Sequence, residues 1–287
     1  MLFLGTAAAE CYPNPFCECP SCQKARASVD RRCKRRRSSL LYDEETLIDF
    51  NADVMYACAE FGVSLSRLKR VFLTHMHEDH FDYFNAAFMN MSVTPAGPIT
   101  FYASPAACSG FQSILDAVRT LPHTLLNDQL QEMEQVARFV ALEVGQTVEL
   151  PGLRVTPVAA RHDGFFLNEC GYNYLLEKPD HTTFYASDTG RFPEESMRFL
   201  QQHSVDTLII EGSFGKTPLP ENAGHLDCFS LCETIDQLYR QGTLHPHSRI
   251  YVTHIGHKGI YNLNDYQQFL DSHFQGRVQV AWDGLKI

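Results

Sequence analysis

Short runs of β-branched and aromatic residues alternate along the chain with longer amphipathic stretches. Runs of the first kind are typical of strands, and stretches of the second kind are typical of helices. We expect strands at residues 2–4, 39–50 (as a hairpin), 70–75, 99–103, 138–143, 153–160, 172–177, 182–188, 206–212, 249–254 and 277–284. We expect helices after Asn51, Phe81, Pro105, Pro193 and Leu226, and another that begins near Asn264. Strand clusters interrupted by helices predict an α/β layered fold.

Two of these segments resemble each other although they lie in opposite halves of the chain. Residues 70–80 read RVFLTHMHEDH and residues 249–259 read RIYVTHIGHKG. Each is a β-branched and aromatic strand followed by Thr-His and then by a second histidine. The similarity predicts a pseudo-duplicated scaffold with a site between its two halves.

Composition narrows the class of protein. The formal net charge of −10 argues against tight binding to duplex DNA or RNA, because a phosphate backbone requires a basic surface. The first ten residues, MLFLGTAAAE, contain no basic group, so we expect neither a signal peptide nor a membrane anchor. The ten cysteines lack the spacing of a disulfide framework, which indicates reduced thiols and a cytoplasmic protein.

The most informative motif is THMHEDH, in which His75, His77, Asp79 and His80 follow a buried strand. Imidazole and carboxylate groups are ligands for zinc, manganese or iron. A tight turn after the strand can direct His75 and His77 to one metal and the other two residues to a second metal.

Three further candidate ligands lie at predicted strand ends: His162, Asp188 and His254. Asp188 is the natural bridge between two metals, since a carboxylate has two oxygens to share. Two bound metals lower the pKa of a bridging water and neutralise substrate oxygens, so neither a serine nor a cysteine nucleophile is required.

This ligand pattern resembles that of the metallo-β-lactamase superfamily along nearly the whole chain. The resemblance implies an αβ/βα sandwich of two mixed sheets flanked by helices, which forms a single hydrolase domain over residues 1–287. It also implies that Asp49, at the end of the early hairpin, supports the metal loop by hydrogen bonding without binding metal.

The N-terminal sequence CECPSC contains Cys17, Cys19 and Cys22, which alone would be an incomplete zinc site or a redox motif. Together with the preceding LGT, it resembles the phosphodiesterase family of the carbon–phosphorus lyase pathway (PhnP). In that family three such cysteines bind a structural zinc with a histidine three residues after the last active-site histidine. Here that residue is His257, and the zinc-binding loop spans residues 11–26.

The same resemblance predicts hydrolysis of small phosphodiesters, cyclic ones included, by a metal-bridging hydroxide that Asp79 orients. His225, just before a helix that Asp227 is expected to cap, would contact phosphate or protonate the leaving group. The alternatives are hydrolysis of lactones, thioesters or RNA on the same fold, and a non-hydrolytic role like that of the relative in pyrroloquinoline quinone biosynthesis. The resemblance also allows a homodimer.

The basic run at residues 31–37 is a candidate contact for nucleic acid or for an anionic substrate. We expect it to be a solvated connector between the cysteine loop and the first hairpin, so nucleic acid is not the favoured partner. The expected partner is a small phosphodiester, and no membrane partner is expected.

Overall fold

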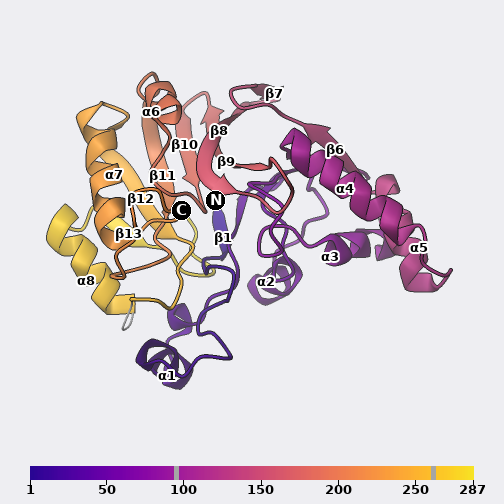
Figure 1. Cartoon of the computed structure of the whole chain (residues 1–287), viewed down its shortest axis with the longest axis horizontal. Coiled ribbons are helices and arrows are strands. Elements are labelled where there is room, and N and C mark those ends of the chain that lie inside the picture. The colour runs from indigo at the N-terminus through magenta and orange to yellow at the C-terminus, as the bar shows by residue number, and fades with distance from the viewer. Residues whose placement is uncertain (94–96, 260–262) are drawn as a thin grey trace.

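Two β-sheets face each other in the centre of the molecule, and helices cover their outer faces (Figure 1). The computed structural model describes residues 1–93, 97–259 and 263–287. The architecture is the αβ/βα sandwich that the family resemblance implies. Both termini lie near each other (Figure 1), and the amino group of Met1 donates to the carbonyl of Ile287 at 3.0 Å.

The first sheet has the strand order β1-β2-β3-β4-β5-β6. Its strands are β1 (Leu2–Gly5), β2 (Ser39–Asp43), β3 (Thr46–Ile48), β4 (Arg70–Phe72), β5 (Ile99–Ala103) and β6 (Ala137–Ala141). The pairs β1–β2 and β2–β3 are antiparallel, and β3 to β6 pair parallel.

The second sheet has the order β13-β12-β11-β10-β9-β8-β7. Its strands are β7 (Val148–Leu150), β8 (Leu153–Asp163), β9 (Cys170–Lys178), β10 (His181–Ala186), β11 (Val205–Glu211), β12 (Leu244–Thr253) and β13 (Val278–Val280). Strands β7 to β10 pair antiparallel, and β10 to β13 pair parallel. Each sheet therefore has an antiparallel half and a parallel half, which agrees with the predicted pseudo-duplication.

Helices occupy the crossovers between strands. They are α1 (Pro20–Ala27), α2 (Val54–Phe61), α3 (Tyr83–Ala87), α4 (Pro105–Val118), α5 (Leu125–Gln131), α6 (Glu194–Leu200), α7 (Cys228–Arg240) and α8 (Leu263–Phe274), with short 3-10 turns at Arg31–Cys33, Phe88–Met91 and Met133–Gln135. Asp227 caps α7 as predicted, since its carboxylate accepts from the backbone N–H of Phe229 and of Ser230 at 2.8 Å. The short strand β7 and the helix α5 were not predicted.

Three layers of apolar side chains hold the sandwich together, and the alternation of side chains along each strand divides them. In β9, Tyr174 and Leu176 point between the sheets, whereas Leu175 packs against the helices outside the second sheet. A separate cluster lies under the helices of the first sheet. Burial on both sheet faces explains why these strands are apolar almost throughout.

Several strands end earlier than predicted, and at β4 the cause is a hydrogen bond from the backbone to a buried carboxylate. The strand expected over residues 70–75 stops pairing near Leu73, because the backbone N–H of Thr74 donates to the carboxylate of Asp49 at 2.8 Å. The backbone leaves the hydrogen-bond ladder at the position where the first candidate ligand begins.

The basic run differs from the solvated connector that we expected. Arg35 is buried, and its guanidinium donates to the hydroxyl of Thr6 at 2.7 Å and to the carbonyl of Ala281 at 2.5 Å. The neighbouring arginines form the ion pairs Arg31–Glu60, Arg32–Asp30, Arg36–Glu60 and Arg37–Asp53. Most of the run is therefore used in intramolecular contacts that join the N-terminal segment to the rest of the protein.

Among the described residues, no helix combines the length and the apolar character that crossing a bilayer requires.

Candidate metal centre

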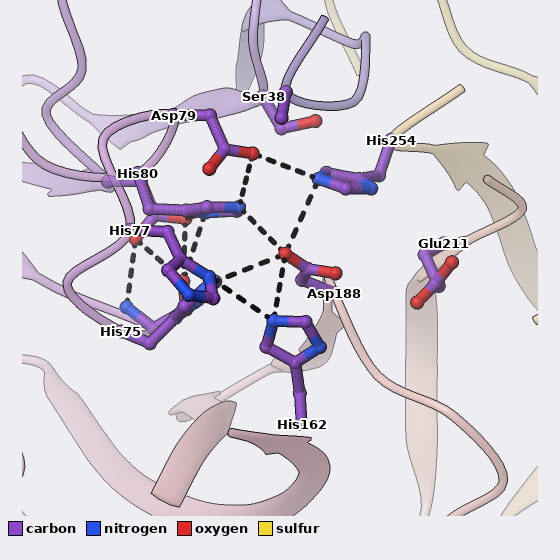
Figure 2. A network of polar contacts seen from close by, with 12 residues as sticks. Ser38, His75, His77, Asp79, His80, His162, Asp188, Glu211 and His254 are labelled. Carbon is purple, nitrogen blue, oxygen red and sulfur yellow. Dashed lines mark hydrogen bonds and ion pairs between the residues drawn. The ribbon is translucent and has the colours of Figure 1, made fainter. Parts of the chain in front are cut away.

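The predicted ligands come together where strands of both sheets end. His75, His77, Asp79 and His80 lie in the loop after β4, and His162 lies near the end of β8. Asp188 follows β10 and His254 follows β12. Figure 2 shows their side chains directed at a common centre, with the carboxylate of Asp188 in the middle.

Three residues of the centre have left-handed backbone conformations. The φ angles are +62° at Asp49, +58° at Asp188 and +54° at His254. Such conformations cost about 1–3 kcal/mol each in residues other than glycine and persist where the surroundings enforce them. Asp49 and His254 directly follow a strand and Asp188 lies two residues after one, so the sharp turn redirects each side chain from the sheet to the site.

The ligand atoms form two groups that share one residue. One group consists of His75, His77, His162 and Asp188, and the other consists of Asp79, His80, Asp188 and His254, with the ligand atoms of each group within 4.8 Å of one another. The shared oxygen, Oδ2 of Asp188, lies 3.1 to 3.6 Å from the Nε2 atoms of His80, His75, His162 and His254. This arrangement matches the predicted bridging role of Asp188.

The polar atoms fit a pair of divalent cations. Nε2 of His254 is buried without a hydrogen-bond partner among the described residues, and it lies 3.6 Å from the carboxylates of both Asp79 and Asp188. Burial, followed by the charge of His80, lowers the pKa of His75 to about 3, so this imidazole is in the neutral form that binds metal. Burial lowers the pKa of His80, but the charges of Asp79 and Asp49 outweigh burial and raise it. The crowded carboxylates thus favour bound positive charge.

Asp49 has the supporting geometry that the sequence predicts. It is fully buried, and its Oδ2 lies 2.8 Å from Nδ1 of His80. Its Oδ1 accepts from the backbone N–H of Thr74 at 2.8 Å and from the hydroxyl of Thr74 at 3.0 Å. A carboxylate on Nδ1 fixes the ring so that Nε2 faces the centre.

His225 lies at the edge of the same centre. Its Nδ1 is 2.9 Å from Oδ1 of Asp188 and 3.1 Å from Oε1 of Glu211. Burial lowers the pKa of His225, but the charge of Glu211 and the hydrogen bonds to Asp188 and Glu211 outweigh it and raise the pKa to about 11.

Glu211 is a residue that the sequence reasoning missed. It is buried at the end of β11, where it also accepts from the backbone N–H of Thr189 at 2.7 Å and from the hydroxyl of Ser213. Ser213 in turn lies 2.8 Å from Nδ1 of His254. The signal was an acidic residue closing an apolar strand, TLIIE, as Asp188 closes FYASD.

The three cysteines gather around the predicted fourth residue. The sulfurs of Cys17 and Cys19 each lie 3.5 Å from Nδ1 of His257, and Cys22 completes a group whose ligand atoms lie within 4.8 Å of one another. Burial raises the pKa of Cys19, but backbone and side-chain hydrogen bonds from Cys22 and His257 outweigh it and lower the pKa to about 6. A Cys₃His set with such a thiolate suits a closed tetrahedral zinc site. On its far side, Nε2 of His257 lies 3.4 Å from Glu10.

A cavity of about 200 Å³ opens above the centre. Its lining combines ligands with groups from the N-terminal segment and from the loop after β12: Ala8, Ala9, Glu10, His77, Asp79, His162, Asp188, Ser213, Phe214, His225, His254, Gly256 and Lys258. Nζ of Lys258 lies 4.7 Å from the centre of the Phe214 ring. Glu10 therefore connects the cysteine site to the wall of this cavity.

Comparison with known proteins shows which family model the sequence matches. A family model described as a beta-lactamase superfamily domain matches residues 48–255. No curated protein matches the sequence significantly.

Among solved structures, a diphosphatase from the PhnP family is similar with a TM-score of 0.71 and 20% identity, over 100% of this chain and 95% of that chain. Zn²⁺-bound PqqB from Methylobacterium extorquens has a TM-score of 0.69 and 19% identity, over 99% and 98%. The short form of human tRNase Z has a TM-score of 0.63 and 15% identity, over 99% and 96%. At these identities the three structures establish the fold alone.

The contact between Asp49 and His80 gives a first prediction. In Asp49→Asn, an amide N–H₂ must face either the ring nitrogen of His80 or the N–H of Thr74, so one buried partner is lost. We expect metal affinity to fall by about 10- to 100-fold, measured by titration against a competing chelator. Asp43→Asn, at the end of β2 and paired with Lys178, is the matched control and should bind metal normally. Unchanged affinity in Asp49→Asn would contradict the supporting role.

The cysteine group gives a second prediction. Cys19→Ser should lose one metal ion per chain by elemental analysis and should melt at a lower temperature, because the loop would no longer be tied to His257. Cys33→Ser changes a half-buried thiol outside the group and should keep both properties. An unaltered metal content in Cys19→Ser would show that these cysteines do not bind metal.

Proposed function

The chain belongs to the beta-lactamase superfamily, and on that premise we propose that it is a dinuclear metal-dependent hydrolase of small phosphodiesters. The observation that carries the proposal is the pair of ligand groups that share Asp188, with His225 in contact with the shared carboxylate. The cysteine group, which the resemblance associates with phosphodiesterases, supports the same choice.

The two groups would hold two divalent cations, zinc, manganese or iron, and the Cys₃His group would hold a structural zinc. Bound there, such a metal pair lowers the pKa of a coordinated water and neutralises phosphate oxygens. Burial raises the pKa of Asp79, but the charge of His80 outweighs it and keeps this pKa well below the usual range. We propose that this ionised carboxylate, which lies in the cavity wall, orients the attacking water.

His225 has the geometry of a proton donor. Asp188 and Glu211 hold Nδ1, and among the described residues no hydrogen bond engages Nε2. The raised pKa keeps the ring protonated, and a ring that is half-buried on the cavity wall can reach the leaving oxygen. A protonated imidazole supplies a proton to a departing alkoxide or a hydrogen bond to a phosphate oxygen.

The cationic groups of the cavity wall, with the metals that its carboxylates would hold, support a small, anionic substrate. Lys258 and His225 are cationic groups of this wall, and no ion pair of Lys258 is found in the part of the chain that the structure describes. The cavity is small, and most of the basic run at residues 31–37 is occupied by internal ion pairs. These features favour a small phosphodiester over RNA.

The activity is tested with bis(p-nitrophenyl) phosphate and added Mn²⁺ or Zn²⁺. We expect metal-dependent release of p-nitrophenolate that a chelator abolishes. His77→Ala removes a ligand and should lower turnover by more than about 100-fold. His247→Ala changes an exposed histidine near the opposite end of β12 and should have no effect. Absence of metal-dependent turnover in the wild type would overturn the proposal.

The role of His225 is tested by changing the leaving group. With 2′,3′-cyclic AMP, whose leaving group is a basic alkoxide, His225→Gln should lower kcat by about 10²- to 10⁴-fold. With bis(p-nitrophenyl) phosphate the loss should be smaller, because p-nitrophenolate departs without a proton. An equal loss with both substrates would identify His225 as a phosphate contact and not a proton donor.

A further inference from the structure

The loop between β8 and β9 presents apolar side chains to solvent beside the polar centre. Phe165 is 64% exposed and Leu167 is 89% exposed. The ring of Phe165 meets the ring of the candidate ligand His77 edge to face, with 6.5 Å between centroids. An aromatic ring in this position offers an apolar face to a ligand that extends out of the cavity.

This loop is fastened to the metal loop by the buried carboxylate of Glu169, which the sequence reasoning also missed. Oε1 of Glu169 accepts from the backbone N–H of Met76 at 2.7 Å, and Oε2 accepts from the N–H of Phe166 at 3.0 Å. Met76 stands between the ligands His75 and His77. The position of the exposed ring is thus tied to the position of the ligands.

The neighbour of Phe165 anchors the loop on its other side. Phe166 packs against Gly110 of α4 so closely that a β-carbon at that glycine would lie 2.1 Å from the ring. The rings of Phe165 and Phe166 are nearly perpendicular, at 89°. One aromatic side chain therefore fixes the loop in the apolar core, and the next one is held out at the rim of the site. A ring that is held in place loses little entropy when a ligand packs on it.

We propose that Phe165 is a stacking platform for a planar heteroaromatic group of the substrate, which makes the substrate a nucleotide-like phosphoester. The inference rests on the proposed function. The cavity has room for a phosphoryl group between the ligands, Lys258 and His225, and His77 forms both part of its wall and the contact with Phe165. The rest of a substrate that leaves the cavity past His77 meets this ring. Every nucleobase has a π-face that stacks on an aromatic side chain.

The test compares AMP with ribose 5-phosphate, which carries a hydroxyl group in place of the base. Their binding to the Mn²⁺-loaded protein is measured by calorimetry. Phe165→Ala should weaken AMP binding by about tenfold and leave ribose 5-phosphate binding unchanged. Phe165→Tyr retains an aromatic face and should bind AMP as the wild type does. Leu167→Ala removes a more exposed apolar side chain of the same loop and should change neither affinity.

Equal affinities of the wild type for the two ligands, or no binding of AMP, would overturn the platform. Equal weakening of both ligands by Phe165→Ala would do so too, since the loop would then only shape the metal site. Binding does not require turnover, so the two proposals can fail separately. Hydrolysis of bis(p-nitrophenyl) phosphate without a Phe165-dependent preference for AMP removes the platform alone. The preference without hydrolysis removes the phosphodiesterase alone.

Discussion

The carboxylate of Asp188 is the interaction on which the rest of the centre depends. One of its oxygens lies within 3.6 Å of four histidine nitrogens that come from both sheets, and the other contacts His225. So many donors around one buried anion are stable only when the surrounding charges balance. Asp49, Asp79 and Glu211 add negative charge, and cations held between these groups would supply the balance.

The sequence pattern was sufficient for an α/β layered fold and for the residues that converge in it, and the family resemblance specified the sandwich. The reason is that THMHEDH concentrates four polar groups after an apolar strand, and each distant ligand stands directly after a strand or near its end. Glu169 escaped detection because a single acidic residue in a loop has no local pattern, and Glu211 because the acidic residue that closes its strand lacks the neighbouring histidines of the first motif. Their roles arise from contacts with Thr189, Ser213 and Met76, which only the fold brings near.

For the basic run at residues 31–37, the expectation from the sequence was wrong. Clustered arginines are ordinarily solvated, yet the structure buries Arg35 and pairs most of its neighbours with acidic residues. Charge composition could not reveal this, because the partners Glu60 and Asp53 belong to a helix and its N-terminus, and Asp283 lies near the end of the chain. The resulting contacts bring the N-terminal segment to the wall of the cavity, where Ala8 and Glu10 become part of the site.

The cysteine group also constrains the order in which the molecule can be completed. Cys17 and His257 are 240 residues apart, so this group cannot exist until nearly the whole chain has been synthesised. Closing a loop of that length costs about 5 kcal/mol in chain entropy. A structural zinc site yields roughly 10–16 kcal/mol, which exceeds that cost. Zinc capture would then be a late event in biogenesis, and a chain truncated before His257 would leave the three cysteines without their fourth ligand.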